Sequence, residues 1–465
     1  MMNKKKIFKL LLTVLLICCT LLTLYQRNSA IDTERILQQS VLKDKTFASH
    51  VQQIEADGIT AYLLEEHSVP IIALNFTFER AGTAYEPENK QGLTLLLTEM
   101  LMNGAGDYDA LQFKDISEEY GVRISFSADT DDFDGFLQMP TANVDMGIKL
   151  LTSTLYKPYF TYDYITLTQN KMQTALRNNH EHIGSVLADK FAEIMYAGHP
   201  YSRPAIGKTE TIAGLTRSDL ITYMHQHFTK QNLIIGIAGD ITPSAAKLLI
   251  HNIFGRLPQQ PQTERIAAVK LETTGAQHYI DFTAPQTMTR FAVKGTHRLS
   301  DDFYPLYLAN YIFGGSGLGS KISKVIREEN GLTYGIYTYL VAKDTLTLLV
   351  GGYSATPDNF RKAQEMLLHE WHKMGENGVT EQELQQAKEA LIASHNLRFA
   401  STGGIAEMLT AMQKYKLGID FLEKRNDYLR EVTLEQVNAA ARKYFGQIPD
   451  FVIVGKQKTK QEEKK

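Results

Sequence analysis

The sequence predicts an α+β protein made of two homologous half-domains joined by a linker, after an N-terminal membrane anchor. Three observations predict this class. Strand-like and helix-like segments alternate without a strict βαβ rhythm. A helix-and-strand unit occurs twice at a common offset, and the Pro/Gln-rich stretch 257–265 between the copies is poor in apolar residues.

The repeat rests on two pairs of segments. Thr216 and Thr433 are 217 residues apart, and each begins a capping pattern followed by a helix and then a strand. Helices beginning at Asn143 and Asn359 have nearly the same offset. Agreement at two places indicates two copies of one unit, and two such units facing each other would enclose a cavity.

The elements of the first copy follow from apolar periodicity and turn residues. We expect strands at 59–64, 71–78, 123–128 and 133–140, and helices at 92–102, 113–120, 143–155 and 162–197. The predicted division of the chain is: 1–30 signal anchor or signal peptide, 31–50 stalk, 51–256 first half-domain, 257–275 linker, 276–457 second half-domain and 458–465 charged tail.

Composition describes a soluble globular body. The chain has 465 residues, 43% of them hydrophobic and 22% charged, which is enough core material for two domains. A net charge of −3 gives no field that would recruit nucleic acid or anionic lipid. We interpret the acidic run Asp129–Asp134 as a solvated strand edge or loop.

The N-terminus has the order of a secretory signal or a signal anchor. Lys4–Lys6 precede the apolar run Leu10–Leu24, and Asn28 makes cleavage after Ala30 unfavourable. We therefore expect an uncleaved single-pass anchor in a bacterial inner membrane with the body in the periplasm, or else a secreted or periplasmic protein after cleavage. Both cysteines lie in this run, so the body has no disulfides and no thiolate metal ligands.

The densest special chemistry lies in Phe313–Gly335, a glycine-rich run followed by a short helix. Ser320 is a plausible N-cap, and Asn330-Gly331 is a C-cap pair. Arg327 falls in the last turn and Tyr334 just beyond the stop. The residues proposed to line a binding loop are Gly314, Gly315, Ser316, Gly317 and Gly319.

This segment has simpler interpretations. Arg327 can pair with a neighbouring glutamate or with the carbonyls at its own helix end, and Tyr334 can pack in a core. A phosphate-binding P-loop is disfavoured because the lysine is displaced by one residue from its position in that motif.

A glycine-rich loop, a helix and then R-E-x-x-G-L-x-Y resembles the second half-domain of the pitrilysin/insulinase peptidases, the inverzincins. The stretches HPYSRPAIG at 199–207 and NLIIGIAGD at 232–240 extend the resemblance over roughly 54–455. It implies half-domains that are sheets with helices on one face and that form a clamshell around an unfolded peptide. It also implies that the loop contacts substrate, and that Arg327 and Tyr334 reach the scissile peptide bond.

The zinc-binding motif of that family is missing. Its three key positions fall on Leu95, Thr98 and Glu99, so neither histidine remains and a hydroxyl replaces the general base. The family's third ligand, a glutamate, should fall within 171–176, where no Asp or Glu occurs. Zinc needs about three side-chain ligands. We expect no metal in this chain, and Glu99 is a relic of the motif or a polar residue on a cavity wall.

Other histidines are weak substitutes. His180/His182 and His225/His227 have a spacing that places their rings on different helix faces. The pair His369/His372 could bind a metal adventitiously but lacks a third ligand nearby. We interpret His199 as a turn or cavity-lining residue.

The leading hypothesis is a metal-free subunit of a two-chain zinc peptidase. It would supply the glycine-rich loop, Arg327 and Tyr334 to the active site of a homologous zinc-bearing partner, which would contribute the zinc. The alternative is a non-catalytic clamshell that binds unfolded peptide or scaffolds an assembly. A self-sufficient metallopeptidase would require an unrecognised site.

Overall fold

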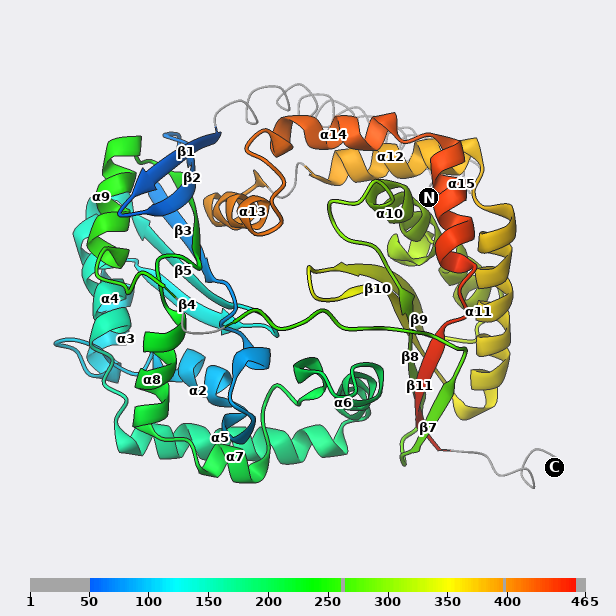
Figure 1. Cartoon of the computed structure of the whole chain (residues 1–465), viewed down its shortest axis with the longest axis horizontal. Coiled ribbons are helices and arrows are strands. Elements are labelled where there is room, and N and C mark those ends of the chain that lie inside the picture. Colours follow the sequence, from blue (N-terminus) through cyan, green and yellow to red (C-terminus); the bar gives the residue numbers. More distant parts are fainter. Residues whose placement is uncertain (1–50, 261–263, 396–398, 457–465) are drawn as a thin grey trace, which may run out of the picture. The chain divides into compact units, whose positions relative to one another are not determined.

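The computed structural model describes residues 51–260, 264–395 and 399–456. They form an α+β architecture with two sheets and many helices, as predicted (Figure 1). The predicted anchor (1–30), stalk (31–50) and charged tail (458–465) lie outside the described residues.

The first sheet has the strand order β1-β2-β6-β3-β5-β4 and the second the order β7-β11-β8-β10-β9. Strand β6 is parallel to β2, as β11 is to β7, and the other neighbouring pairs in both sheets are antiparallel. Apart from the extra strand β1, the second sheet therefore repeats the first. The strands are β1 Val51–Ala56, β2 Ile59–Glu65, β3 Ile71–Phe78, β4 Arg123–Ala128, β5 Phe133–Pro140, β6 Leu233–Gly239, β7 Gln277–Asp281, β8 Thr287–Lys294, β9 Gly335–Ala342, β10 Thr347–Ala355 and β11 Asp450–Gly455.

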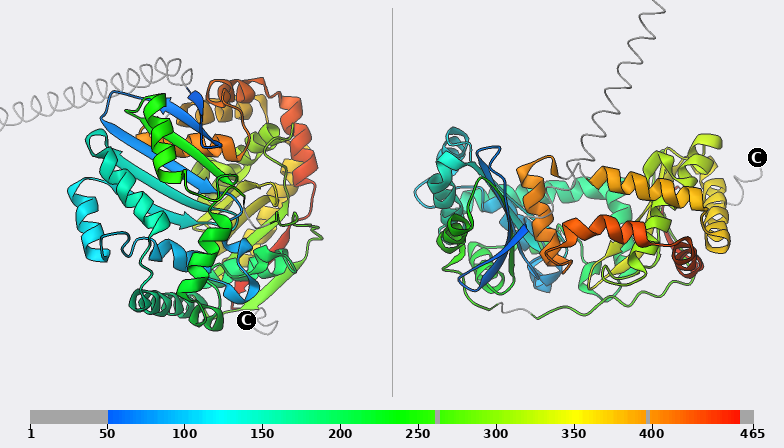
Figure 2. Two further views of the ribbon diagram at one scale, coloured as in Figure 1. Left: turned by 60° about the vertical axis from the view of Figure 1, so that its left-hand side comes forward. Right: turned by 90° about the horizontal axis from the view of Figure 1, so that it is seen from above.

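The α-helices repeat this order in part, with five of the described helices between the fourth and fifth strands of the repeat in each half (α4–α8 and α11–α15). They are α2 Leu93–Met100, α3 Ala110–Glu119, α4 Val144–Tyr156, α5 Tyr162–Glu181, α6 Ile183–Met195, α7 Thr209–Ala213, α8 Arg217–His227, α9 Pro243–Phe254, α10 Phe303–Asn310, α11 Pro357–Asn377, α12 Glu381–His395, α13 Thr402–Lys414, α14 Phe421–Glu431 and α15 Leu434–Phe445. The capping boxes predicted at Thr216 and Thr433 are present at the beginning of α8 and α15. Residues 264–276, between α9 and β7, form no helix or strand and follow an extended path (Figure 2).

The prediction of one helix over 162–197 was wrong. The helix ends at Glu181, His182 adopts an extended conformation with φ −103° and ψ 114°, and a new helix begins at Ile183. The break lets the two pieces pack on different partners, α5 against α2 and α6 against β8 and β11. Gly184, a poor helix former, is the signal in the sequence.

Each sheet is covered on one face by a helix from the other half of the chain. From the first half, α6 packs its apolar side chains Leu187 and Phe191 in one cluster with Val452 and Val454 of β11. From the second half, α13 packs on β6, β3 and β2. Among the described residues, each half thus has an apolar cluster of its own, a third cluster joins residues of both halves, and each half covers one face of the other half's sheet.

The approach of α13 to the first sheet is close and polar. Thr410 donates from Oγ1 to the carbonyl oxygen of Asn75 at 3.1 Å, and Gln413 donates from Nε2 to that of Ile235 at 2.6 Å. A Cβ on Gly236 would lie 2.2 Å from the carbonyl oxygen of Ala406. Only glycine fits there, because any side chain would push the helix away.

The acidic run is not the solvated edge that we expected. Asp132 is only 4% exposed, and its carboxylate lies 2.5 Å from the Nζ atom of Lys414 at the end of α13. Lys343, in the β9–β10 turn, pairs with Asp131 at 2.6 Å and with Asp129 at 3.3 Å. The run therefore joins the first sheet to two elements of the second half through ion pairs, whose partners lie more than 200 residues away in sequence.

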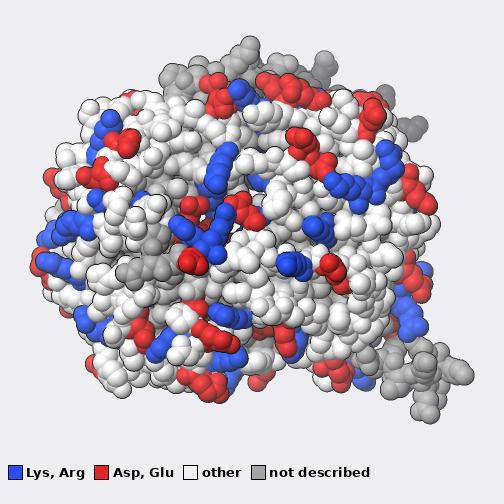
Figure 3. Space-filling view, viewed as in Figure 1, with Lys and Arg blue, Asp and Glu red and all other residues white. Residues whose placement is uncertain are grey.

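The predicted location needs correction. No helix in the described ranges is both long and apolar enough to cross a bilayer. The segment on which the inner-membrane and periplasmic location depended lies outside those ranges, so we abandon this location. On the face shown in Figure 3, acidic and basic side chains are mixed, in keeping with the small net charge.

Candidate functional site

The glycine-rich segment folds as a series of tight helical turns. After α10, the chain continues through a π-helical turn at Tyr311–Gly315, a 3₁₀ turn at Gly317–Gly319 and a second π-helical segment at Ser323–Glu329. Ser320 is buried, and its Oγ accepts a hydrogen bond from the amide of Ser323 at 3.4 Å, which confirms its role as a cap.

Glycine is needed in this loop for two different structural reasons, close packing and backbone conformation. A Cβ on Gly314 would lie 2.4 Å from Oγ1 of Thr338, and one on Gly315 would lie 2.8 Å from Nδ2 of Asn310, so both are required by close packing. Gly317 has φ +65° with open space around it, so its reason is backbone conformation. Gly315, Gly317 and Gly319 are exposed and Ser316 is half-buried, which leaves this tip accessible.

The structure brings Arg327 and Tyr334 together. Gly331, with φ +61°, ends the helical segment, and its amide donates to the carbonyl oxygen of Arg327 at 3.1 Å. The chain then turns back, so that Nε of Arg327 donates to the carbonyl oxygen of Tyr334 at 3.0 Å. The Tyr334 side chain is 71% exposed, so the prediction that it could pack in a core is wrong.

Sequence reasoning missed the tyrosines that follow. Tyr334 directly precedes β9, the edge strand of the second sheet, on which Tyr337 and Tyr339 stack with ring centroids 6.1 Å apart. Both remain more than 40% exposed, while Thr338 between them is buried. The alternation Y-x-Y within a strand was the available signal.

The degenerate zinc positions lie on α2. Leu95 is half-buried, Thr98 donates its hydroxyl to the carbonyl oxygen of Leu95 at 2.8 Å, and Glu99 is exposed. Helix α5, which packs against α2, turns the apolar Met172 into the core at the place where a third ligand was expected. These residues do not fit a zinc ion, because leucine offers no donor atom and the threonine hydroxyl is already used within its own helix.

The alternative histidines do not assemble a metal site either. No group of three or more His, Cys, Asp or Glu side chains suited to a metal occurs among the residues that the structure describes. His227 is buried against Tyr223, and burial lowers its pKa to about 4. His372 pairs with Glu376 at 3.1 Å on an exposed face.

His199 is a turn residue, as one of the two interpretations had it. Its Nδ1 accepts from the amide of Tyr201 at 3.1 Å, and its Nε2 donates to the carbonyl oxygen of Ala267 at 2.8 Å. Both ring nitrogens are thus used in holding the chain.

Glu86, which sequence reasoning also missed, is the most perturbed acid near the degenerate motif. Its carboxylate accepts from the amides of Gly92 at 2.8 Å and Thr94 at 2.6 Å, where α2 begins. Burial raises its pKa to about 7, although these hydrogen bonds oppose the shift. The group fixes the beginning of α2 from within the protein.

Comparison with known proteins agrees with this geometry. Residues 72–209 match the model of insulinase (peptidase family M16), and residues 214–391 match that of the peptidase M16 inactive domain. The crystal structure of a peptidase M16 inactive domain from Pseudomonas fluorescens superimposes with a TM-score of 0.82 at 25% identity, covering 88% of this chain and 98% of that one. A Helicobacter pylori protease has the same fold, with a TM-score of 0.77 at 15% identity over 87% of this chain and 99% of that one.

The sequence relatives are distant but match over most of their length. An uncharacterized zinc protease of Rickettsia felis is 21% identical over 86% of this chain and 96% of its own. A protein of Helicobacter pylori described as "Non-peptidase homolog YmxG" is 22% identical over 83% of this chain and 89% of its own.

The fold thus defines a peptidase-like protein of two repeated sheets, in which the helix expected to carry the zinc motif holds Leu95, Thr98 and Glu99 at the key positions. The chain belongs to the insulinase family of peptidases, family M16.

Proposed function

We propose that this chain is the metal-free subunit of a two-chain zinc peptidase. The single observation that carries the proposal is a contrast within one molecule. The positions of the zinc ligands on α2 hold Leu95, Thr98 and Glu99, whereas Arg327 and Tyr334 lie together beside an accessible glycine-rich tip. Relatives described as an inactive domain and as a non-peptidase homolog support the first half of the contrast.

The chemistry assigned to this chain is hydrogen bonding to a peptide carbonyl. A homologous partner subunit would hold the zinc, which supplies an activated water. The hydrogen bond from Nε to the Tyr334 backbone orients the guanidinium group of Arg327. In this role, Arg327 and the Tyr334 hydroxyl donate to the carbonyl oxygen of the unfolded peptide substrate as negative charge develops on it. The tip from Gly314 to Gly319 would align the peptide backbone.

The test is peptide turnover by the chain mixed with a zinc-bearing relative from the same organism. We expect the mixture to hydrolyse the peptide and neither protein to do so by itself. Mass spectrometry should find no stoichiometric zinc in this chain. Arg327→Ala is expected to lower turnover by about 10²-fold or more, because loss of one oxyanion donor has an effect of this size.

Arg430→Ala provides the matched control, because Arg430 is an exposed arginine whose ion pair with Asp427 on α14, at 2.7 Å, lies on the surface and contributes little to stability. Turnover with Arg430→Ala should equal that with the unmodified chain, and the melting temperatures of both variants, Arg327→Ala and Arg430→Ala, should be unchanged. Unchanged turnover of Arg327→Ala would disprove the catalytic role.

A second candidate is a non-catalytic protein that binds unfolded peptide or scaffolds an assembly. The exposed tyrosine row on edge strand β9 favours it, because it offers a peptide-binding surface without any need for zinc. Peptide binding by this chain, with no turnover in any mixture, would select this candidate.

A further inference from the structure

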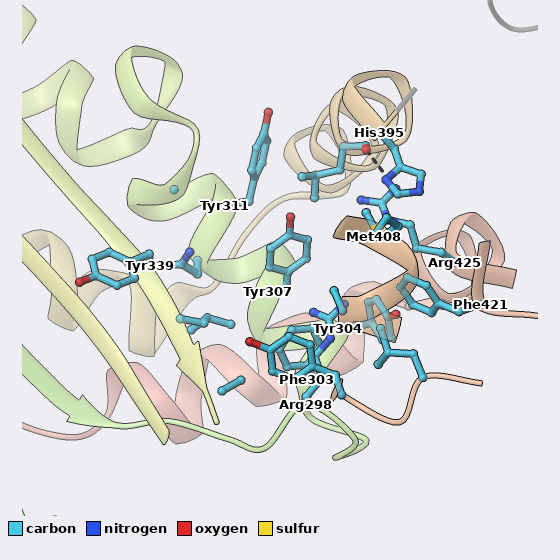
Figure 4. Close-up of a pocket in the computed structure, with 18 of the residues that line it drawn as sticks. Arg298, Phe303, Tyr304, Tyr307, Tyr311, Tyr339, His395, Met408, Phe421 and Arg425 are labelled. Carbon is cyan, nitrogen blue, oxygen red and sulfur yellow. Dashed lines mark hydrogen bonds between the residues drawn. The ribbon is translucent and has the colours of Figure 1, made fainter. Parts of the chain in front are cut away.

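The aromatic cavity beside the glycine-rich tip has arginines in its lining, but they are engaged within the protein. This cavity measures about 790 Å³ and is lined by tyrosines of α10 and β9 (Figure 4). The Arg298 guanidinium lies 4.2 Å from the centre of the Phe303 ring, and Nη1 of Arg425 donates to the carbonyl oxygen of Leu391 at 3.2 Å. Neither guanidinium is therefore free for a ligand.

A smaller cavity, of about 210 Å³, is lined mostly by charged residues. It lies where the turn after β3, the acidic run Asp129–Asp134, the linker, the β9–β10 turn and the end of α13 meet. Both halves of the chain therefore contribute to its walls, and none of the site chemistry above uses it.

Most of the charges in this cavity are already paired. Three ion pairs use six of the nine described charged residues that line it: Lys343 with Asp131 at 2.6 Å, Lys414 with Asp132 at 2.5 Å, and Arg265 with Asp344. The other three are Glu79, Arg80 and Lys416. Within the part of the chain that the structure describes, none of these three side chains makes a hydrogen bond or an ion pair. Glu79 and Arg80 are only half-buried and Lys416 is exposed, so all three are accessible to a ligand.

The charges that act on Glu79 show that its carboxylate faces this cavity. Burial raises the pKa of Glu79, and four positive charges oppose that rise, those of Arg80, Lys414, Lys416 and Arg265. All four of these residues line the cavity. They are close enough to influence the carboxylate, but none of them forms an ion pair with it, so the cavity separates the acid from the cations.

The two unpaired cations occupy unusual backbone positions. Arg80 has φ +59° and Lys416 has φ +52°, in the left-handed region that residues other than glycine seldom adopt. At the end of α13 the amide of Leu417 donates to the carbonyl oxygen of Met412 at 2.9 Å, and that of Lys416 to Gln413 at 3.0 Å. This is a Schellman motif, in which glycine usually takes the position of Lys416. The backbone therefore gives no reason for a lysine there, and strain of this kind is typical of ligand-binding positions.

The backbone of Arg80 is held on both sides. Its amide donates to the carboxylate of Asp132 at 3.0 Å, and its carbonyl oxygen accepts from Nδ1 of His227 at 2.9 Å. These bonds fix the backbone at the edge of the cavity while the guanidinium group stays unpaired.

We propose that this cavity binds a small zwitterion, a free α-amino acid or a dipeptide. The carboxylate of the ligand pairs with Arg80 and Lys416, and its ammonium group pairs with Glu79. The cavity is smaller than pockets for drug-sized molecules and suits a ligand of this size. Phosphate would satisfy the two cations but would lie against the Glu79 carboxylate, which repels it. The site goes beyond the proposed function and does not depend on it, because it uses neither α2 nor the glycine-rich tip.

The test is isothermal titration calorimetry of the full chain with L-alanine and with L-alanyl-L-alanine, whose small side chains keep steric fit out of the comparison. At least one of them should bind, and the preferred one reports the separation of Glu79 from the two cations. Acetylating its ammonium group or amidating its carboxylate should each weaken binding about tenfold or more, because charge-assisted hydrogen bonds are lost.

Variants assign the two charges of the ligand. Glu79→Gln should weaken the zwitterion about tenfold and leave the acetylated form unchanged. Lys416→Gly should weaken the zwitterion by a similar factor and leave the amidated form unchanged, and its melting temperature should not fall, because glycine adopts this backbone conformation freely. Lys424→Met, at an exposed lysine that pairs with Asp420, is the control and should bind every form as the unmodified chain does.

Absence of binding by both zwitterions would overturn the proposal. A blocked form that binds as tightly as its parent would also overturn it, whatever the variants do. Displacement of the zwitterion by inorganic phosphate at an equal concentration would replace it with a plain anion site.

Discussion

At the scale of single residues, Glu86 shows how a buried acid couples folding to pH. Its two hydrogen bonds stabilise the first turn of α2, yet burial keeps its folded pKa near 7, above the ordinary value of 4.5. The folded state therefore holds its proton at a pH where the unfolded chain has released it. The resulting stability is complete below pH 4.5 and is lost as the pH rises through 7.

We predict that Glu86→Gln removes this pH dependence. Between pH 4.5 and pH 7 the unmodified chain should lose about 3 kcal/mol of unfolding free energy relative to the variant, since one pKa unit corresponds to roughly 1.4 kcal/mol. Urea denaturation at a series of pH values measures the difference. Glu88→Gln, on the exposed preceding turn, is the control, and parallel profiles for both variants would contradict the assignment.

Sequence reasoning succeeded at residues whose roles are local. Ser320 and Gly331 cap one helical segment, and short-range patterns specify such caps. The sequence also placed Arg327 near the end of this segment and Tyr334 just beyond it, but not the hydrogen bond from the Arg327 side chain to the Tyr334 backbone. Asp132 was misread because its partner Lys414 comes from a distant helix whose position no local pattern encodes. Glu86 was missed although its partners are only six and eight residues away, because its burial depends on tertiary packing.

At the scale of elements, the close packing of α13 on the first sheet requires a glycine at one position of a strand. Gly236 on β6 lets the helix backbone approach, and Thr410 and Gln413 then donate hydrogen bonds to backbone carbonyls of the first sheet. The strands and most helices follow from periodicity, but the docking of a helix on the distant sheet does not. The break at His182 has one local signal, Gly184, and the packing of α5 and α6 on different partners accounts for the rest.

We predict that Gly236→Ala lowers the free energy of unfolding by about 1–3 kcal/mol, the usual cost of overpacking. The new methyl group would overlap the carbonyl of Ala406. Gly214→Ala is the matched control: its nearest neighbour would lie 3.5 Å away, so the change should stay within about 0.5 kcal/mol. Chemical denaturation measures both, and equal stabilities would show that α13 does not need this approach.

At the scale of the whole described body, ion pairs join the two repeated halves. Burial lowers the pKa of Lys414, but attraction to Asp132, Asp129 and Asp134 outweighs burial and raises it. Burial raises the pKa of Asp132 to about 6 even with Lys414 beside it. The attraction between Lys414 and Asp132 therefore offsets the cost of burying their charges, and removing either partner leaves that cost uncompensated.

We predict that Lys414→Met destabilises the chain by about 3 kcal/mol at pH 7, because it leaves a buried carboxylate without its partner. The loss should be smaller at pH 5, where Asp132 takes up a proton. Lys424→Met removes an exposed pair with Asp420 and should leave the free energy of unfolding nearly unchanged. Comparable losses in both variants, measured by urea denaturation, would refute a special role for the buried pair.

The cover of the first sheet by α13 also affects how the protein is made. All six strands of that sheet have been synthesised once Gly239 is added, but the helix that covers one face begins only at Thr402. At ordinary elongation rates the delay is on the order of ten seconds. During that interval the sheet face that α13 covers in the finished protein has no covering helix.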